Sequence, residues 1–341
     1  MHVGLVGGGG ISATHAQAAL AIPCVSVAAI QGMNEEKVRA LCARYGGAPY
    51  TRFDTFLAHR PMDFVVIGSP SGLHAEQGIA AAALGLHVLV EKPIDISTDR
   101  ADALIGAAEK ANVLLGVIFQ DRFKPGPTAM KQILQEGRLG RPLLVDARVP
   151  WYRPPEYYAT SRWRGTLALD GGGALINQAI HTLDLLVWLL GDVTHVQART
   201  STLLHDIDAE DSGAAILEFA CGALGTFTFT TAAYPGYPRR IAVTGTRGTM
   251  VLEQDEVIGL DLVGGAPERQ RDGGRDLSPR LPAGVADQPA SSPLVSDIGP
   301  HRAVFEDFVS AIRDRRPPRC DGREGRRSLA LVEAIYQASA Q

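Results

Sequence analysis

Cysteine is scarce in this sequence, and the few that occur exclude a cysteine-based metal motif. The 341 residues contain four cysteines, Cys24, Cys42, Cys221 and Cys320, which lie far apart along the chain. Their spacing matches no metal-ligand pattern, so we expect no metal site. A few scattered cysteines are typical of a reduced compartment, which predicts a cytoplasmic protein whose thiols are buried and inert.

Strong net charge and long apolar runs are missing as well. The formal net charge is −4, which gives no electrostatic footprint for nucleic acid or for an anionic membrane surface. No apolar run approaches the length of a membrane-spanning helix. Met1 and His2 lead directly into an apolar stretch, so we expect no signal peptide. The expected partner is therefore a small molecule, with no nucleic acid and no membrane.

The length of the chain and a change of pattern along it predict two domains. A chain of 341 residues exceeds what one ordinary hydrophobic core serves. In the first part, residues 1–121, helix and strand signals alternate, which predicts an α/β Rossmann domain with a doubly wound parallel sheet. Its predicted strands are 2–6, 25–30, 63–68, 88–90 and 113–119, and its predicted helices are 13–21, 34–45, 74–84 and 95–111.

The second part, residues 122–341, is predicted to be an α+β domain with an open, mostly antiparallel sheet. Short connections such as Cys221-Gly222 favour hairpins. The exposed face of such a sheet is a natural surface for self-association, so we expect a homodimer or homotetramer. The predicted strands are 143–149, 194–203, 212–219, 223–230, 239–244, 249–252 and 257–262, the predicted helices are 125–137, 174–190, 301–315 and 325–340, and 264–300 is predicted to be a long loop.

A glycine-rich turn follows the first predicted strand. Gly7 and Gly9 fill the first two places of the dinucleotide fingerprint, and Ser12 stands at the third. The first glycine permits the tight turn, and the second lets a pyrophosphate approach the backbone. Free N–H groups at the following helix start hold the phosphate charge. We therefore assign Gly7, Gly9, Gly10, Ile11 and Ser12 to cofactor binding.

The end of the second predicted strand leaves the choice between NAD and NADP open. The fingerprint expects an acid there for the adenosine ribose hydroxyls, but this chain has Gln31. Gln31 donates and accepts hydrogen bonds without charge, and we assign it to the cofactor. Lys37, Arg39 and Arg52 are the nearest cations for a 2′-phosphate, and surface roles on helices are the alternative for each.

An acid, a lysine and a proline follow the apolar run Val88-Leu89-Val90. This run predicts a buried strand that stops at Glu91, Lys92 and Pro93. Ligands of open α/β sheets bind beyond the carboxyl ends of the strands. We therefore assign Glu91 and Lys92 to the site, with a cis bond before Pro93 as a possibility. The alternative is a strand followed by a polar turn.

Ser69, Pro70 and His74 follow another predicted strand at the same edge of the sheet. We assign these three residues to the cofactor, beside the nicotinamide and its ribose. The alternative for His74 is a histidine at a helix start that hydrogen-bonds its own turn.

A loop rich in aromatic residues and arginine lies in the second domain. Such side chains stack on sugar rings or hold carboxylates and phosphates, and the alternative is a loop packed on its own domain. We assign Arg122, Trp151, Tyr158 and Arg164 to substrate binding. The loop also contains Tyr152, Arg153, Tyr157, Arg162 and Trp163.

The predicted helix 174–190 carries a second set of polar residues. It follows Gly171-Gly172-Gly173 and bears Asn177, His181 and Asp184. A spacing of four places Asn177 and His181 on one face. His181 is a candidate general base because its pKa lies near working pH, and a satisfied core histidine is the alternative.

Together these motifs resemble the Gfo/Idh/MocA oxidoreductases. The resemblance rests on the glycine turn, Glu91-Lys92-Pro93, the three glycines and the Asn177-x-x-x-His181-x-x-Asp184 helix, and it extends over nearly the whole chain. It implies a Rossmann domain, an open-sheet domain, a nicotinamide cofactor, and roles for Lys92 and His181 at the substrate. Family members commonly have aspartate where this chain has Asn177. An asparagine at this position also resembles the branch of the family that acts on nucleotide-linked sugar acids.

The resemblance implies an NAD- or NADP-dependent oxidoreductase acting on a secondary alcohol of a sugar, sugar acid, nucleotide sugar or cyclitol. In this hypothesis His181 accepts the hydroxyl proton, Lys92 stabilises the charge on the same oxygen, and Asn177 positions the hydroxyl or His181. Two other functions stay open on the same fold: an NAD-dependent glycosidase with no net cofactor turnover, and a non-catalytic cofactor-binding sensor.

Overall fold

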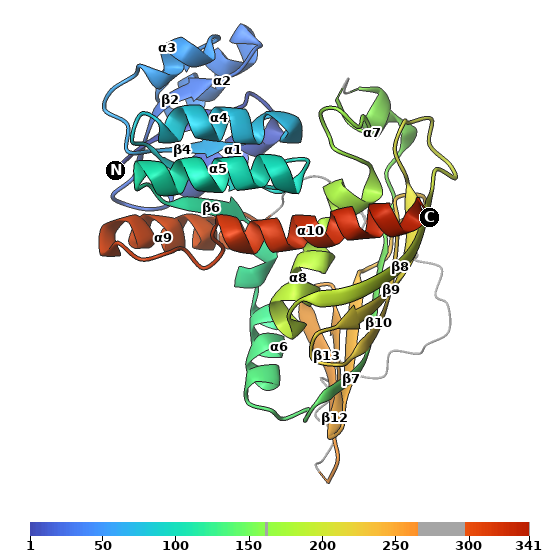
Figure 1. Ribbon diagram of the computed structural model, residues 1–341. Helices are drawn as coiled ribbons and strands as arrows, with labels where there is room; N and C mark the ends of the chain where they lie inside the picture. The colour runs from blue at the N-terminus through green and yellow to red at the C-terminus, as the bar shows by residue number, and fades with distance from the viewer. Residues whose placement is uncertain (161–162, 265–296, 341) are drawn as a thin grey trace, which may run out of the picture. The chain divides into compact units, whose positions relative to one another are not determined.

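The computed structural model of the protein describes residues 1–160, 163–264 and 297–340 (Figure 1). Within this part the chain forms two compact units, each with its own sheet. The first unit comprises Met1–Gln120, Thr166–Gly171 and the described residues of Val295–Ala330, and the second comprises the described residues of Asp121–Gly165, Gly172–Leu294 and Leu331–Gln341. The chain leaves the first unit after Gln120 and returns to it at Thr166–Gly171 and again towards its C-terminal end.

The first unit contains the predicted doubly wound parallel sheet. Its strands are β1 (His2–Val6), β2 (Ser26–Gln31), β3 (Ala48–Tyr50), β4 (Phe64–Ile67), β5 (His87–Glu91) and β6 (Leu115–Ile118). They pair in the order β3-β2-β1-β4-β5-β6, and every pair is parallel. This order and the crossover helices are those of a Rossmann fold, so the predicted fold class is confirmed.

The register of the central strands brings the predicted site residues to one edge of this sheet. Val6 of β1 lies opposite Ile67 of β4, and Ile67 lies opposite Val90 of β5. These strands therefore end in line, because parallel neighbours with this register finish at the same level. The segments that begin at Gly7, Gly68 and Glu91 all leave the sheet at this edge.

Helices pack on the sheet of the first unit and pair with one another. They are α1 (Gly10–Leu20), α2 (Glu35–Tyr45), α3 (Phe53–Leu57), η1 (Ser71–Leu73), α4 (His74–Ala82), α5 (Thr98–Ala111), α9 (Gly299–Asp314) and the first part of α10 (Gly322–Ser339). Helix α4 packs against α5, and α1 packs against α9. The ring of Phe308 on α9 meets the ring of Phe64 on β4, with 5.8 Å between their centroids.

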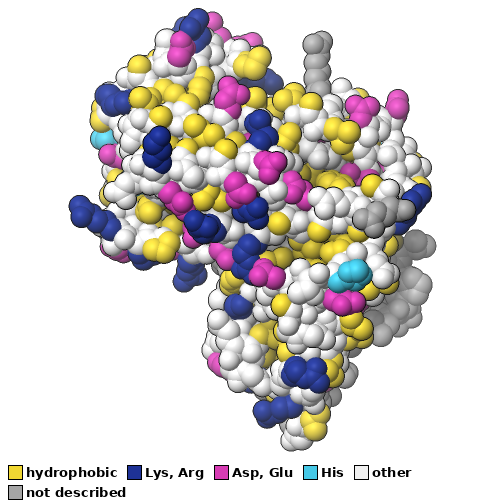
Figure 2. Space-filling model, in the orientation of Figure 1, with side chains coloured by type: hydrophobic (Ala, Val, Ile, Leu, Met, Phe, Trp, Pro, Cys, Tyr) yellow, Lys and Arg dark blue, Asp and Glu magenta, His cyan; other side chains and the backbone are white. Residues whose placement is uncertain are grey.

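Charged side chains of both signs are interspersed on the visible face of the first unit (Figure 2). Glu109 of α5 pairs with Arg323 of α10 at 2.6 Å, and Asp102 pairs with Arg326 on the same two helices. All four side chains are at least one-third exposed. Such pairs contribute little stability because water screens them.

The second unit is built on a seven-stranded, mostly antiparallel sheet. Its strands are β7 (Pro142–Pro150), β8 (Val193–Ser201), β9 (Ser212–Phe219), β10 (Leu224–Thr230), β11 (Arg240–Gly245), β12 (Gly248–Glu253) and β13 (Glu256–Leu262). They pair in the order β13-β12-β11-β7-β10-β9-β8. The β7–β10 pair is parallel, and the other pairs are antiparallel. The predicted open sheet and its hairpins are confirmed.

One face of this second sheet is covered by helices, and the other carries exposed apolar residues. Alternating residues of β7, such as Val145 and Ala147, are buried, and α6 and α8 pack on the sheet. On the opposite face Leu144, Ile216 and Leu224 are each about half exposed. The helical segments of the unit are η2 (Gln120–Phe123), which begins at the unit boundary, α6 (Pro125–Gln135), α7 (Pro155–Ala159), η3 (Leu175–Ala179), α8 (Ile180–Leu190) and the last part of α10.

Three expectations about local structure are corrected. Helix α1 begins at Gly10 and not at residue 13, and glycine is tolerated there because the first N–H groups of a helix have no intrahelical partner to lose. The predicted helix 174–190 is interrupted by the π-turn η3 before α8 begins. The thiols of Cys24 and Cys221 are exposed and that of Cys42 is half-buried, since the first two lie in turns; Cys320 is buried.

Two further predictions of the sequence analysis concern residues that the structure does not describe. Most of the predicted loop 264–300 lies outside the described residues, as does Arg162. Within the described residues, no helix has the length and apolar character needed to cross a membrane.

Candidate active site

A glycine turn at the end of β1 forms a cradle open to solvent. Gly7 has φ +120°, and a Cβ there would lie 2.6 Å from the carbonyl oxygen of Gly68. The Ser12 hydroxyl donates to the Gly7 carbonyl at 2.8 Å and closes the turn. Gly9 and Gly10 are exposed, and a Cβ at either would meet nothing within 4 Å. The backbone at the start of α1 is thus accessible to a ligand.

The residues of this cradle fit a dinucleotide phosphate. Gly9 caps α1 without a side chain, and the first turn of α1 contains no acidic residue. A helix N-terminus of this kind attracts anions through its N–H groups and its dipole. Gly7, Gly9, Gly10, Ile11 and Ser12 therefore have the geometry that a bound pyrophosphate requires.

Gln31 is the last residue of β2, and its side chain is mostly buried. It is 7% exposed, and its amide Nε2 donates to the Thr51 carbonyl at 3.4 Å. Among the candidate cations for a 2′-phosphate, Arg39 pairs with Glu35 at 2.7 Å and Arg52 pairs with Asp54 at 2.5 Å. Both arginines are therefore already paired with neighbouring carboxylates.

Lys92 follows β5 and is held between two anchored neighbours. Glu91 accepts a hydrogen bond from the Lys92 backbone N–H at 3.1 Å. The other Glu91 oxygen lies 2.8 Å from Nε2 of His15, which is 1% exposed. The Lys92–Pro93 bond is cis, as the sequence allowed. The Lys92 side chain is half-buried, and its backbone has little freedom to move.

Glu91 stays ionised although it is 8% exposed. Burial raises the pKa of its carboxyl group, but the hydrogen bond with His15 and the neighbouring charges of His301 and Lys92 together lower that pKa to about 2. Helices α1 and α9 contribute the two histidines, whose ring centroids are 6.4 Å apart. The cluster His15–Glu91–His301 thus places a stable negative charge beside the backbone of Lys92.

Replacing Glu91 by glutamine tests this ionisation. The pKa of Glu91 falls from 4.5 to about 2 on folding, so the ionised carboxylate stabilises the fold above pH 4.5 and loses that effect as pH falls towards 2. This shift corresponds to roughly 3 kcal/mol. In urea unfolding at a series of pH values, the advantage of the wild type over Glu91→Gln should shrink by up to that amount below pH 4.5. An advantage independent of pH would contradict the ionised cluster.

His74 contacts the backbone of Pro93, the residue that follows Lys92. It is 1% exposed, with Nδ1 2.8 Å from the Pro93 carbonyl and Nε2 2.9 Å from the Ser69 carbonyl. Burial lowers the pKa of His74 more than these two carbonyls raise it, so the ring is neutral and donates to one carbonyl at a time. This matches the alternative interpretation, in which His74 hydrogen-bonds its own turn.

Ser69 and Pro70 lie in that turn and are both half-buried. The Ser69 hydroxyl donates to Oε1 of Gln77 at 2.6 Å. Asp95, which is fully buried, accepts from the backbone N–H of Ala75 at 2.7 Å and from Nε of Arg100 at 2.6 Å. Asp95 thereby ties the chain after Lys92 to the start of α4.

In the second unit, Asn177 and His181 are the half-buried positions on an otherwise buried stretch of helix. Every other residue from 172 to 187 is buried. The predicted spacing of four residues holds across the junction of η3 and α8, and the N–H of Asn177 donates to the Gly173 carbonyl at 3.1 Å. This exposure argues against a core histidine, and π-turns are frequent at functional sites.

Glu210 and Tyr336 hold the start of this helical segment. Glu210 accepts hydrogen bonds from the backbone N–H of Gly173 at 3.1 Å and of Leu175 at 2.7 Å. The Tyr336 hydroxyl donates to Glu210 at 3.0 Å. Burial raises the pKa of both groups, that of Tyr336 further because of the Glu210 carboxylate.

Two of the three glycines before this segment are required by that packing. A Cβ at Gly173 would lie 1.8 Å from the Glu210 carbonyl oxygen. Gly172 has φ +155°, and a Cβ there would lie 2.1 Å from the Tyr336 hydroxyl. The glycines therefore allow Glu210 and Tyr336 to approach the backbone that precedes Asn177.

Arg122 and Asp184 form a buried bidentate ion pair. Nε and Nη2 of Arg122 donate to the two carboxylate oxygens of Asp184 at 2.8 Å and 2.7 Å. The side chains are 2% and 0% exposed. The pair joins η2 to α8 inside the second unit, so this geometry gives no support to the predicted substrate contact of Arg122.

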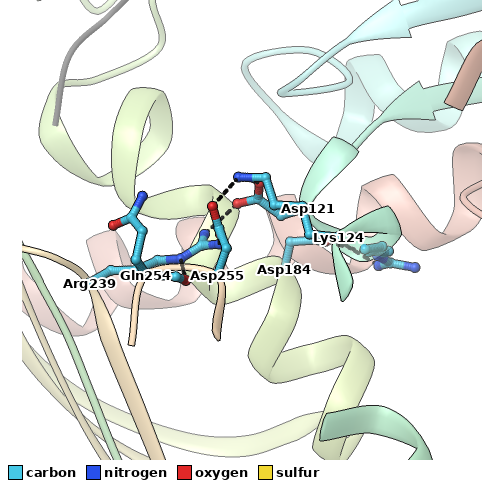
Figure 3. Close-up of polar contacts among 7 residues, drawn as sticks. Asp121, Lys124, Asp184, Arg239, Gln254 and Asp255 are labelled. Carbon is cyan, nitrogen blue, oxygen red and sulfur yellow. Dashed lines mark hydrogen bonds and ion pairs between the residues drawn. The ribbon is translucent and has the colours of Figure 1, made fainter. Parts of the chain in front are cut away.

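Four further charges alternate in a cluster around Asp121 (Figure 3). Arg239 contacts both Asp121 and Asp255, the latter at 2.7 Å. Lys124 contacts Asp121 at 2.7 Å and Asp255 at 3.0 Å. Asp121 and Arg239 are 4% and 2% exposed. Each carboxylate thus binds both cations, and we call these four residues the Asp121 cluster.

Several aromatic and arginine residues in the described segments 151–160 and 163–164 stack on one another. The guanidinium of Arg164 lies 4.1 Å from the ring centroid of Tyr157, and that of Arg153 lies 5.3 Å from it. Tyr158 is buried, and its hydroxyl lies 3.0 Å from Oγ1 of Thr231. Within the described chain, the Trp151 indole N–H is buried without an acceptor. The loop is therefore packed on its own unit, with cationic groups held by aromatic rings.

The sequence did not identify the residues that support these side chains. Asp121, Glu210, His15 and His301 are buried polar groups. Asp121 bonds Arg239, 118 residues away, and Glu210 bonds Leu175 and Tyr336, 35 and 126 residues away. One signal was available: Asp121 is the last residue of the predicted first domain and directly precedes Arg122. The identity of their partners needed the fold.

Comparison with protein families identifies both parts of the chain. The model for "Oxidoreductase family, NAD-binding Rossmann fold" matches residues 1–119, and the model for "GFO/IDH/MocA C-terminal domain" matches residues 128–251. The chain therefore belongs to the Gfo/Idh/MocA family of oxidoreductases, and its first unit is an NAD-binding Rossmann domain. This confirms the family that the motifs indicated.

Individual relatives are dehydrogenases of sugars and polyols. The WlbA dehydrogenase of Bordetella pertussis, solved in complex with NADH and UDP-GlcNAcA, is 34% identical, with 100% of this chain and 95% of that chain covered and a TM-score of 0.86. Myo-inositol 2-dehydrogenase of Thermotoga maritima is 28% identical over 74% of this chain and 75% of its own length. Levoglucosan dehydrogenase of Pseudarthrobacter phenanthrenivorans is 26% identical over 100% of this chain and 96% of its own length.

Proposed function

We propose that this chain transfers hydride between NAD and a secondary alcohol of a nucleotide-linked sugar or sugar acid, with free sugars and cyclitols as the wider substrate class. The observation that carries the proposal is that Asn177 and His181 are half-buried, whereas every other residue from 172 to 187 is buried. Lys92, half-buried after β5, supplies the second charged group.

The proposed roles follow from the chemistry of alcohol oxidation. The nicotinamide, when bound, takes the hydride from the alcohol carbon. His181 accepts the hydroxyl proton as general base, and the ammonium of Lys92 stabilises the negative charge that develops on the same oxygen. Asn177 hydrogen-bonds the hydroxyl or His181 but takes no proton. In reduction each role is reversed.

The cofactor side of the proposal rests on the cradle and on Gln31. Gly7 to Ser12 supply the phosphate site, Gln31 faces the adenosine ribose without charge, and Ser69, Pro70, Glu91 and Lys92 approach the nicotinamide half. The pairing of Arg39 and Arg52 with carboxylates leaves a 2′-phosphate without these two partners. This supports NAD over NADP.

The substrate side is supported by one relative and by the aromatic–arginine loop. WlbA, at 34% identity, was solved with a nucleotide-linked sugar acid. Arg164 and Trp151 in the loop 151–164 suit an anionic or polyhydroxylated ligand, because arginine pairs with carboxylate and phosphate and aromatic rings stack on sugars. Tyr158, buried against Thr231, supports the loop.

A panel of nucleotide sugars, sugar acids, free sugars and cyclitols tests the function. The purified protein is mixed with each compound and NAD or NADH, and the absorbance of reduced nicotinamide is followed. Net absorbance change with a uronic-acid nucleotide sugar is the expected result. Release of an aglycone without absorbance change would favour the glycosidase, and cofactor binding without either would favour a sensor.

Assembly is proposed to use the open face of the seven-stranded sheet. Leu144, Ile216 and Leu224 are about half exposed there, and exposed apolar patches mark self-association surfaces. Sedimentation equilibrium should give the mass of a homodimer or homotetramer, and the mass of a single chain would contradict this. The cytoplasmic location stays a prediction from the sequence.

A further inference from the structure

Within one turn of His181 on its own helical segment, the sequence offers one carboxylate, Asp184, because position 177 is an asparagine. An imidazole that accepts a proton becomes a cation, and a nearby negative charge stabilises it. Asn177 is uncharged, and Asp184 on the same helix is already occupied by the buried guanidinium of Arg122. The negative charge that stabilises the protonated ring of His181 therefore has to come from another element of the second unit.

The Arg122–Asp184 pair brings that element to the right face of α8. Asp184 lies three residues after His181, so both side chains project from the same side of the helix. The bidentate bonds of 2.7 Å and 2.8 Å fix η2 against this side. Asp121 is the residue before Arg122 in the single turn of η2, so its position relative to α8 is fixed as well.

Asp121 is a buried carboxylate that is held ionised. Burial alone raises its pKa, but the charges of Arg239, His181 and Lys124, in that order, lower the pKa well below its usual range. The interaction is mutual: a carboxylate that is stabilised by the imidazolium of His181 stabilises that imidazolium equally.

We propose that Asp121 is a positioning residue for His181, held by Arg239 and Lys124 so that its carboxylate stabilises the imidazolium formed during alcohol oxidation. The inference rests on the proposed function. The substrate hydroxyl gives its proton to His181, and the hydride leaves the same carbon for the nicotinamide. Asp121 takes neither, so its contribution is electrostatic.

The charged groups joined to Asp121, Asp184 and Asp255 by ion pairs come from several elements of the unit. They are Asp121 and Arg122 on η2, Lys124 at the start of α6, Asp184 on α8, Arg239 before β11, and Asp255 between β12 and β13. Their formal charges sum to zero, so the distance of each group from His181 decides its effect. Lys92, in the proposed reaction, adds a cation on the substrate side.

Asp255 provides a matched control for Asp121. Its carboxylate binds the same two cations, Lys124 and Arg239, but its side chain is 31% exposed and His181 is among the charges that act on Asp121. Asp121→Asn and Asp255→Asn therefore remove the same kind of ion pair from the same partners. They differ in which carboxylate acts on His181.

The pH dependence of kcat/KM for alcohol oxidation distinguishes the two variants. The base must be neutral, so activity falls below the pKa of His181. Asp121 favours the protonated ring, and its removal lowers that pKa. The acid limb should move down by about one pH unit in Asp121→Asn and stay in place in Asp255→Asn. An unmoved limb in Asp121→Asn, or equal shifts in both variants, would overturn the proposal.

Two additions keep the test decisive. If Asp121→Asn fails to fold, the double variant Asp121→Asn/Arg239→Gln is compared with the single variant Arg239→Gln, and the loss of Asp121 should again move the limb down between these two. The titration of His181 is also followed by NMR of histidine-labelled, NADH-bound enzyme, assigned by its loss in His181→Gln. This measurement needs no turnover, so an unchanged His181 titration in the variants refutes the inference even where the proposed reaction is correct, and a wild type without turnover refutes the function alone.

Discussion

Replacing Lys92 by methionine is expected to lower kcat for alcohol oxidation by about 10²- to 10³-fold, the usual cost of removing one group that stabilises a developing oxyanion. Methionine keeps the length and apolar stem of lysine and removes the ammonium. The backbone N–H of Lys92 donates to the Glu91 carboxylate at 3.1 Å, and Nδ1 of His74 lies within hydrogen-bond distance of the Pro93 carbonyl. We therefore expect the local fold to be retained. NADH affinity should change little, because the phosphate cradle of Gly7 to Ser12 is untouched.

Steady-state kinetics and NADH titration by fluorescence measure the two effects separately. Lys110→Met is the matched control, since Lys110 is an exposed lysine in the last turn of α5 and should behave as the wild type. Turnover by Lys92→Met at more than about a tenth of the wild-type rate would remove Lys92 from the chemistry. Loss of NADH binding in parallel with kcat would reassign it to the cofactor.

His181→Gln is the second prediction with a large effect. A glutamine keeps hydrogen-bonding capacity but cannot accept a proton, so kcat should fall by about 10²- to 10⁴-fold, the range for a general base. The acid limb of the pH–rate profile should also disappear, because the group that titrates is gone. Added hydroxide replaces part of the base, so the residual rate should rise steadily with pH.

The exposed His195 of β8 supplies the control for this substitution. His195→Gln removes an imidazole from the same unit and should leave both the rate and the profile unchanged. An intact acid limb in His181→Gln would assign the titration to another group. Thermal unfolding of each variant shows whether a rate change reflects chemistry or folding.

Much of the fold followed from local pattern alone. The apolar run before Glu91 predicted β5 and the position of Lys92, and the alternation of helix and strand signals predicted the parallel, doubly wound sheet, without its short edge strand β3. The hairpin at Cys221-Gly222 and the strands β9 to β13 were predicted by alternation and turn residues. These features depend on contacts between near neighbours in sequence, which a single sequence records.

The supporting shell of the site was not predictable in the same way. The π-turn at Leu175–Ala179 lies in a stretch that is buried on nearly every side, so the apolar pattern of the sequence carries no signal of it. The glycines at 171–173 indicated a special helix start, but that Glu210 and Tyr336 occupy the space they leave needed the fold. From the sequence we interpreted Arg122 as a ligand-binding arginine. In the structure it is buried against Asp184, which lies 62 residues away in the chain.

The most direct test of the account is a double-mutant cycle on kcat/KM with wild type, Lys92→Met, His181→Gln and the combined variant. If the ammonium and the imidazole act on one alcohol in one transition state, either loss disables the pair, and the combined variant should be within a few-fold of the slower single variant. Effects that multiply would contradict the account, because they would mean that the two side chains serve independent steps.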